Sequence, residues 1–392
     1  MPFDAIEKLA SALHDPPLQC KANRARYTSG DVWTIMEVEF VNGTVWIVRL
    51  RTDHCAEEPS ALDDVKRRVE CEVATLKLVK DRTNVPVPTV YAYSATAQND
   101  LGFPYIIMSA ILGRRPRDIG IDTTGPLSDD YRATFERYCA SLARIHLELS
   151  RIRFDQFGSV YLAPSDPQGY VVGPIAWAGT RPCGSVADFY AVNVQPLQKG
   201  VRAIDGDSTG QRKRAALCLW VYWKAVAACT HPNAPTQSML VHTDLHMSNT
   251  LVNEHGDIVG VFDWDCATLM PAAVFAAQVR MFGGGLWQAP SEERLALFRL
   301  YDAALRAAEV EADVPEAERF VADMHASAPC RMMALLQQWA VNGHDFSDSD
   351  AMSIFCDHLF GSSDVEALME SSNFETFFEF FDTLGTATKS GP

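Results

Sequence analysis

The chain has 392 residues, of which 47% are hydrophobic and 21% are charged, so it holds enough apolar material for a bilobal globular body. Fifty acidic residues against 34 Lys and Arg give a formal net charge of −16, which disfavours nucleic acid and anionic membranes as partners. No signal peptide or membrane-spanning apolar run is found, and the ten Cys are scattered singly. We therefore expect a cytoplasmic protein with reduced thiols.

The first hundred or so residues are predicted to form a short helix and an antiparallel sheet. Residues 1–18 have a helical pattern that ends at two prolines. Residues 24–51 alternate between apolar and polar, with turns at Ser29–Asp31 and Asn42–Gly43, which predicts three antiparallel strands. Two further strands complete a five-stranded sheet, at residues 89–94 and 105–109.

Residues 61–80 are predicted to form an amphipathic helix within this part of the chain. Its apolar stripe is made by Val65, Val69, Leu76 and Val79. Glu72 falls in the same stripe, whereas Glu70 lies on the polar face. Because an unpaired buried carboxylate is costly, we expect Glu72 to have a basic partner on the sheet.

The rest of the chain is predicted to be mostly helical. The clearest amphipathic patterns lie at residues 131–149, 212–229, 295–305 and 329–341. An acidic, Phe-rich segment, residues 363–385, is expected to form one terminal helix. Residues 151–210 are rich in Gly and Pro, and we expect them to build part of an acceptor pocket.

The stretch from residue 239 to residue 265 carries the densest set of chemically active residues. Strands are predicted at residues 239–241, 250–252 and 258–262. The polar loops then lie at strand ends on the same side of a hairpin, which brings Asp244, Asn249 and Asp263 together. Their carboxylate and amide oxygens suit Mg²⁺, and an acid beside such a site could accept a proton from a hydroxyl.

A second chemistry is open for the same stretch. His242, Asp244 and His246 alternate, so on an extended strand they would share a face and could ligate zinc. No second His or Cys cluster with ligand spacing supports this alternative.

The pattern H-x-D-x-x-x-x-N at residues 242–249, followed by an apolar strand and D-W-D, resembles the catalytic and metal loops of the aminoglycoside phosphotransferase and choline kinase group. These are relatives of protein kinases. The resemblance implies a bilobal α+β protein-kinase-like fold, with an N-lobe in residues 1–110 and a C-lobe in residues 111–392. It makes Asp244 the catalytic Asp, with Asn249 and Asp263 as Mg²⁺ ligands and Asp265 as a helper.

The same resemblance implies an ATP site in the N-lobe. Ser29 and Gly30 occupy the place of the loop that covers the phosphates, although the turn alone would read as a plain β-turn. Arg49 stands where the family has a basic residue, usually Lys, that holds the α- and β-phosphates, and Glu72 matches its partner. Met108 is expected to border the adenine, and backbone groups of residues 109–111, Ala110 among them, are expected to bond it.

The function implied is an ATP- and Mg²⁺-dependent small-molecule kinase. It would move the γ-phosphoryl group to a hydroxyl of a cationic or polyhydroxylated acceptor, held in an acidic cleft of the C-lobe. The alternative is a kinase-fold protein without phosphotransfer, acting as a binding or regulatory module or reused for another reaction. A protein kinase is disfavoured because D-F-G, A-P-E and an Arg-containing catalytic loop are absent from the sequence.

Overall fold

The computed structural model of the chain describes residues 1–30, 32–53, 59–121, 129–204, 209–279, 292–343, 345, 347 and 350–387. The chain divides into two compact units that are interleaved in sequence. Unit 1 comprises Met1–Ile121, Glu148–Pro182 and Met239–Leu269, and unit 2 comprises Asp122–Leu147, Cys183–Ser238 and Met270–Pro392. The lobe boundary expected after residue 110 stays a prediction.

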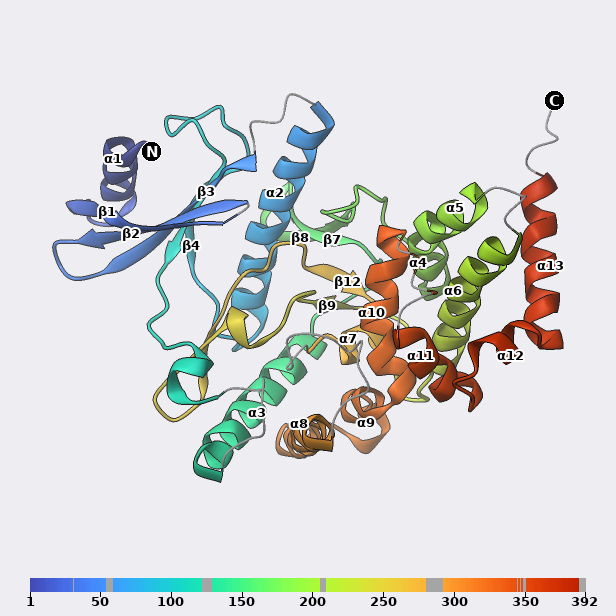
Figure 1. Ribbon diagram of the computed structural model, residues 1–392. Helices are drawn as coiled ribbons and strands as arrows, with labels where there is room; N and C mark the ends of the chain where they lie inside the picture. Colours follow the sequence, from blue (N-terminus) through green and yellow to red (C-terminus); the bar gives the residue numbers. More distant parts are fainter. Residues whose placement is uncertain are drawn as a thin grey trace. The chain divides into compact units, whose positions relative to one another are not determined.

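The main sheet of unit 1 has five antiparallel strands in the order β1-β2-β3-β5-β4 (Figure 1). The strands are β1 (Cys20–Ser29), β2 (Trp33–Phe40), β3 (Val45–Arg51), β4 (Val90–Ser94) and β5 (Tyr105–Ser109). In the register, Arg49 lies opposite Ile35 on one side and Ile106 on the other. The predicted five-stranded sheet is confirmed.

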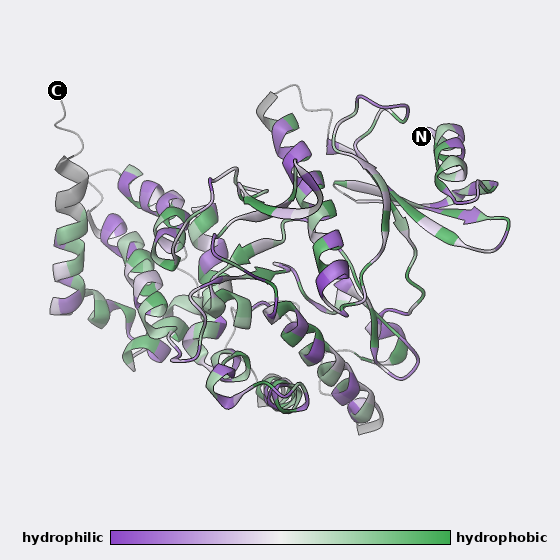
Figure 2. Cartoon of the chain, turned by 180° about the vertical axis from the view of Figure 1, so that it is seen from behind, coloured by the Kyte–Doolittle hydropathy of each residue, from purple (hydrophilic) through white to green (hydrophobic). Residues whose placement is uncertain are grey.

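Two helices, α1 (Phe3–Leu13) and α2 (Pro59–Arg82), cover opposite faces of this sheet. Successive side chains of a strand point to opposite faces, so alternate residues of β3 belong to different cores. On the α1 face, Val48 and Leu50 pack with Ile6 and Ala10. On the α2 face the core contains Trp33, Val69, Val73, Ile106 and Met108. Green and purple residues alternate along α2 in Figure 2, as expected for an amphipathic helix.

A second hairpin, formed by β7 (Ser159–Ala163) and β8 (Asp166–Gly173), also packs on α2. Figure 1 places α2 between this hairpin and the main sheet. At the end of α2, the Tyr170 hydroxyl donates a hydrogen bond to the Asp81 carboxylate. The hairpin lies in the Gly- and Pro-rich stretch for which the sequence predicted no regular element.

The stretch around residues 239–265 forms two small sheets in unit 1. A three-stranded sheet has the order β12-β9-β6, and β10 pairs with β11. The strands are β6 (Arg153–Phe154), β9 (Ser238–Val241), β10 (Thr250–Val252), β11 (Ile258–Val261) and β12 (Thr268–Met270). Short 3-10 helices lie at Pro116–Ile119 and Met247–Asn249. The predicted strands are confirmed to within one residue.

The segment that follows β5 is joined to the β10–β11 hairpin. Arg114 and Val252 exchange two backbone hydrogen bonds, each with a nitrogen–oxygen distance of 2.8 Å. Two glycines allow this approach: a Cβ at Gly113 would lie 2.8 Å from Cβ of Leu251, and one at Gly260 would lie 2.7 Å from Cγ2 of Ile111. Both distances are shorter than a carbon–carbon contact of about 3.5 Å. The hairpin and residues 111–114 therefore form one piece.

Unit 2 is helical in the part of the chain that the structure describes. Its helices are α3 (Asp129–Ser150), α4 (Val186–Asn193), α5 (Gln195–Ala203), α6 (Thr209–Ala228), α7 (Ala272–Ala276), α8 (Glu292–Glu311), α9 (Val321–Ala326), α10 (Ala328–Asn342), α11 (Asp350–Phe360), α12 (Val365–Met369) and α13 (Ser372–Ala387), with a 3-10 turn at Glu316–Glu318. Among the described helices, none combines the length and the apolar character needed to cross a membrane.

The prediction of one helix at residues 363–385 is wrong, because the segment forms α12 and then α13. The break lies at Ser371. Its hydroxyl donates to the Leu368 carbonyl at 2.6 Å and accepts from the Phe374 N–H at 3.4 Å. A serine that bonds the backbone in this way begins a new helix.

Candidate active site

The loop after β9, residues 242–249, carries the first group of candidate residues. Thr243 has a φ of 65°, a left-handed conformation that is rare for a β-branched residue. The chain therefore turns sharply at the end of β9. Such strained positions are concentrated at functional sites, which agrees with the predicted role of the next residue, Asp244.

Asp244 is held by two neighbours from its own loop. Its Oδ2 atom lies 3.2 Å from Nε2 of His246 and 3.1 Å from Nδ2 of Asn249. Nδ1 of His246 accepts a hydrogen bond of 3.1 Å from the Ser248 N–H. A neutral imidazole has one donor and one acceptor, so this bond assigns the ring proton to Nε2, which donates to Asp244.

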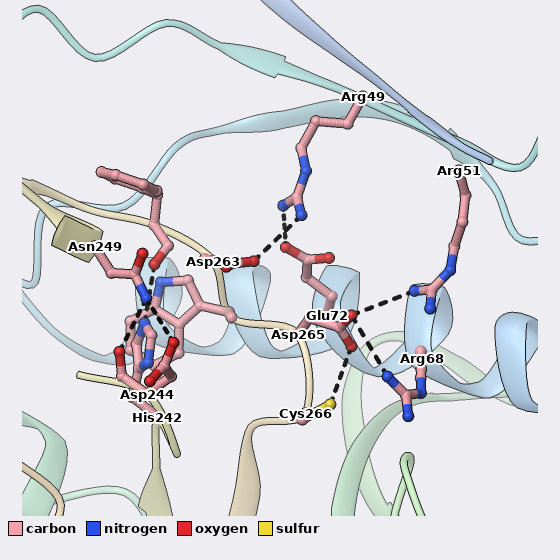
Figure 3. A network of polar contacts seen from close by, with 12 residues as sticks. Arg49, Arg51, Arg68, Glu72, His242, Asp244, Asn249, Asp263, Asp265 and Cys266 are labelled. Carbon is pink, nitrogen blue, oxygen red and sulfur yellow. Dashed lines mark hydrogen bonds and ion pairs between the residues drawn. The ribbon is translucent and has the colours of Figure 1, made fainter. Parts of the chain in front are cut away.

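Asn249 is oriented by the same network. Its amide nitrogen donates to the Asp244 backbone carbonyl at 3.0 Å as well as to the Asp244 carboxylate. Both bonds use the nitrogen, and in the part of the chain that the structure describes no hydrogen bond engages Oδ1 of Asn249. Figure 3 shows the amide nitrogen turned toward Asp244. The amide oxygen is thus the end of this side chain that could bind a cation.

The loop after β11, residues 262–269, carries the second group. The Phe262 N–H donates to the Asn249 carbonyl at 3.1 Å, which brings the two loops together as predicted. Asp263 and Cys266 have φ values of 66° and 70°, so this loop also contains left-handed residues. The carboxylate of Asp263 is half-exposed, which leaves it accessible for a ligand.

His242 of the first loop and Trp264 of the second loop are buried and connect the two loops. Nε2 of His242 donates to the Phe262 carbonyl at 3.0 Å, and its ring packs against the buried Trp264 ring with centroids 4.5 Å apart. Burial lowers the pKa of His242 to about 4. This histidine is therefore a neutral structural residue at physiological pH.

Arg49 links β3 to its predicted partner Glu72 and also to Asp263, a contact that was not predicted. One guanidinium nitrogen forms a buried ion pair with Glu72, and Nη2 lies 3.4 Å from Oδ1 of Asp263 (Figure 3). The guanidinium also packs over the Trp33 ring, 4.3 Å from its centroid. Burial raises the pKa of Glu72, and the charge of Arg49 opposes that shift. The predicted Arg49–Glu72 ion pair is confirmed.

The other residues predicted for the nucleotide lie on the main sheet or next to it. Ser29 bonds Thr34 through their hydroxyls at 2.9 Å, and the Gly30 N–H donates to the Trp33 carbonyl at 2.9 Å, so both close the turn between β1 and β2. Asp31 of this turn lies outside the described residues. Met108 is buried on the α2 face.

The segment after β5 also carries a predicted residue. The Ala110 N–H donates to the Val45 carbonyl at 3.2 Å and so extends the pairing with β3. Its carbonyl and the backbone of Ile111 are the remaining candidates for contacts with a base. The roles of Ser29, Gly30, Met108 and Ala110 toward a nucleotide stay predictions.

Among the residues of this region that were not predicted as parts of the site are His246, Ile35 and Ile47. His246 was considered only as a zinc ligand, although its spacing of two residues from Asp244 could have indicated a direct contact. Ile35 and Ile47 share the α2 face with Arg49, since they lie opposite or two residues from it in the register. Ile35 is 38% exposed, which is unusual for an apolar residue on a covered face.

The donors in the two loops suit a hard cation better than zinc. Among the described residues, no group of three His, Cys, Asp or Glu side chains could hold a metal ion, so the zinc alternative lacks a ligand set. The amide oxygen of Asn249 and the half-exposed carboxylate of Asp263 fit Mg²⁺, which often takes one or two protein oxygens and fills its shell with water and phosphate.

Comparison with known proteins supports the same family. The sequence pattern of the phosphotransferase enzyme family (APH) matches residues 37–303. The chain is 26% identical over 259 residues to clavilactone A biosynthesis cluster protein Y of Ampulloclitocybe clavipes, which covers 62% of this chain and 60% of that protein. It is 30% identical over 97 residues to altered inheritance of mitochondria protein 9 of Meyerozyma guilliermondii, covering 25% of this chain and 15% of that protein. The match thus spans less than two thirds of each relative.

Among solved structures, a thermostable mutant of aminoglycoside phosphotransferase APH(4)-Ia, in ternary complex with AMP-PNP and hygromycin B, is similar to this chain with a TM-score of 0.50. The identity is 15%, and the match covers 92% of this chain and 99% of that one. This likeness concerns the fold and confirms the predicted protein-kinase-like α+β architecture. With the family pattern covering more than half of its length, the chain belongs to the phosphotransferase enzyme family.

Proposed function

We propose that this protein is an ATP- and Mg²⁺-dependent phosphotransferase that acts on a hydroxyl group of a small molecule. The observation that carries the proposal is the meeting of the two loops in unit 1. Asp244 and Asn249 are bonded to each other in one loop, and Asp263 of the other loop is paired with Arg49. Phosphoryl transfer needs mainly positioning and charge neutralisation, which these residues can supply.

In this proposal Asp244 accepts the proton of the acceptor hydroxyl. The hydroxyl oxygen forms a bond to the γ-phosphorus, and the bond between that phosphorus and the bridging oxygen breaks, so that ADP leaves with the electron pair. His246 and Asn249 hold the Asp244 carboxylate through its Oδ2 atom. The three residues therefore present an oriented base to the hydroxyl.

Asn249 and Asp263 are the residues that would hold Mg²⁺, which supplies neutralisation of the phosphate charge when it is bound. Arg49 would hold phosphate oxygens from the opposite side, with Ser29 and Gly30 above them. We assign the exposed side chain of Ile35, together with Ile47, to the face on which an adenine ring packs, with Met108 behind it.

The acceptor is proposed to be a cationic or polyhydroxylated small molecule. The net charge of −16 supports a cationic acceptor through long-range attraction. The similar APH(4)-Ia structure holds AMP-PNP and hygromycin B, a pair of a nucleotide analogue and a small molecule. The same two ligand classes are what we propose here.

A second candidate function is a nucleotide-binding module without phosphotransfer. The observation that favours it is that Arg49 is already engaged with two acids, Glu72 and Asp263, and is buried. A guanidinium whose two terminal nitrogens already contact acids has fewer N–H groups left for a phosphate.

A titration of AMP-PNP with and without Mg²⁺ tests the proposal, followed by measurement of ADP release over a panel of hydroxylated and cationic metabolites. We expect Mg²⁺ to raise the affinity for AMP-PNP by at least tenfold, and Asp263→Asn to remove that gain. Mg²⁺-dependent binding without transfer to any compound would favour the second candidate. A lack of nucleotide binding under both conditions would contradict both.

A further inference from the structure

Two arginines of β3 and two acids of the D-W-D sequence are matched one to one. Arg49 and Arg51 are two residues apart on a strand, so both point to the α2 face. Arg49 contacts Asp263 at 3.4 Å, and Nη1 of Arg51 contacts Oδ2 of Asp265 at 3.3 Å. Figure 3 shows the two guanidiniums directed from one strand toward the two acids.

The two pairs differ in their access to solvent. The side chains of Arg51 and Asp265 are 1% and 14% exposed, whereas that of Asp263 is 46% exposed. Charge pairs in a water-poor environment interact more strongly and exchange partners less readily than exposed ones. The Arg51–Asp265 pair is therefore the permanent contact, and the Arg49–Asp263 pair is the exchangeable one.

Other contacts of Arg51 and Asp265 reinforce their pairing. Arg51 is held by Asp53 through two bonds of 2.7 and 3.0 Å. Oδ2 of Asp265 also lies 4.0 Å from Nη1 of Arg68, and its Oδ1 accepts from Sγ of Cys266 at 3.4 Å. Both oxygens of Asp265 are thus engaged by protein donors, unlike the half-exposed carboxylate of Asp263.

The two carboxylates of this loop depend on β3 for their position. Local bonds support the rest of the loop: the Ala267 N–H donates to the Trp264 carbonyl at 3.1 Å, Nε1 of Trp264 donates to the Val261 carbonyl at 3.2 Å, and the Thr268 hydroxyl donates to the Cys266 carbonyl at 2.8 Å. The carboxylates of Asp263 and Asp265 are instead paired with Arg49 and Arg51. When Mg²⁺ binds Asp263 and phosphate binds Arg49, the loop would lose the Arg49–Asp263 contact with β3. The Arg51–Asp265 contact would remain.

We propose that Arg51 is a positioning residue that holds the metal loop through Asp265, and that Asp265 is an anchor and not a metal ligand. The role in metal binding rests on the proposed function, whereas the anchoring of the loop does not. Arg51 thereby fixes where the carboxylate of Asp263 stands while its partner changes from Arg49 to the cation.

The first test measures hydrogen exchange of residues 263–269 in the nucleotide-free protein. Arg51→Met is expected to raise exchange in this loop about tenfold, because a charge-assisted contact that restrains local opening is lost. Arg51→Lys, which keeps the charge, should raise it less. Arg67→Met removes a neighbouring arginine of α2 that pairs with Asp64 and serves as the matched control, with exchange at the parental level.

The second test titrates AMP-PNP with and without Mg²⁺. Arg51→Met should lose most of the gain in affinity from Mg²⁺, with metal-free affinity changed less than about threefold. Asp265→Asn should act in the same direction, and combining the two should add little, because both remove one contact. Where Arg51→Met does not fold, Arg51→Lys carries both tests with smaller shifts in the same direction.

Two results would overturn the proposal. One is parental loop exchange in a folded Arg51→Met variant. The other concerns Asp265→Asn. If this variant loses the gain in AMP-PNP affinity from Mg²⁺ but keeps parental hydrogen exchange in the loop, and Arg51→Met keeps the parental gain from Mg²⁺, then Asp265 is a metal ligand. If the parent itself shows no Mg²⁺-dependent binding of AMP-PNP, the proposed function fails, and the exchange experiment still decides the anchoring role.

Discussion

The loops at residues 242–249 and 262–269 lie side by side, but they are held in different ways. In the first loop, Asp244 is bonded by His246 and Asn249, which are two and five residues away in sequence. In the second loop, Asp263 and Asp265 are bonded by Arg49 and Arg51, each 214 residues away. The acid of the first loop is thus held by residues of its own loop, whereas the acids of the second loop are held by a strand that is distant in sequence.

This difference predicts different responses to mutation. A locally organised loop keeps its shape when a distant contact is lost, so changes in it act on the chemistry of single side chains. A loop that depends on distant charges loses its shape when those charges are removed. Each of the following experiments separates these two behaviours.

The largest effect is expected from Asp244→Asn. We expect transfer to fall by about 10²–10⁴, because the proton acceptor is lost, while AMP-PNP affinity changes less than about threefold. Phosphate transfer and equilibrium binding would be measured on the same preparation. Glu254→Gln, an exposed acid in the turn after β10, is the matched control. Parental turnover of Asp244→Asn would reduce Asp244 to an ordinary loop residue.

Arg49→Ala comes next and tests the distant support of the second loop. We expect AMP-PNP affinity to fall about tenfold or more, since the phosphate contact is lost and Glu72 is left buried without its partner. Arg49→Lys should fall less because it keeps the charge. Both variants would be compared with Arg26→Ala, an exposed arginine of β1. Unchanged nucleotide affinity and turnover in Arg49→Ala would remove Arg49 from the site.

A smaller effect is expected from His246→Gln. Losing the imidazole donor to Asp244 should lower the maximal rate about tenfold, because the carboxylate is less well oriented. Affinity for AMP-PNP should stay at the parental level. His255→Gln, in the exposed turn of the same hairpin, is the control. An unchanged maximal rate would show that His246 does not orient the base.

The smallest effect concerns stability and pH. Because the pKa of His242 is about 4 in the folded protein and near 6.5 when unfolded, the unfolded state binds more protons between these values. Stability should therefore rise from pH 4 to 6.5, with a contribution of at most about 3 kcal/mol from this residue. The free energy of unfolding, measured with urea at several pH values, should rise less steeply with pH for His242→Asn than for the parent. Equal slopes would contradict the assignment.

The two loops also show what a sequence can and cannot predict. The strands around residue 250 and the nearness of Asp244 and Asn249 followed from local patterns and spacing, whereas the protein-kinase-like fold was implied by the family resemblance of residues 242–265. A carboxylate in an apolar stripe demands a partner, which singled out Glu72, and the family resemblance pointed to Arg49 as that partner. Arg51 carried no such local signal, since an arginine at a strand end reads as a surface residue until its acid partner is located.

Two elements were not predicted correctly, the β7–β8 hairpin and the break before α13, because their sequences give weak or misleading local patterns. The β7–β8 hairpin lies among Gly158, Gly169 and Gly173, which interrupt the alternation by which strands are recognised. Its stability comes from packing on α2, which no local pattern reveals. The break before α13 was missed because Ser371 lies within an otherwise continuous helical pattern, where only its hydrogen bonds show that a new helix begins.

The junction of residues 111–114 with the β10–β11 hairpin bears on the geometry of the proposed site. The backbone expected to contact the base and the loop that carries Asp244 belong to one hydrogen-bonded piece within unit 1. In the proposed function, Gly113, Gly260 and the pairing of Arg114 with Val252 would therefore fix the distance between the base and the transferred phosphate. A side chain at either glycine would push the two segments apart and lengthen that distance.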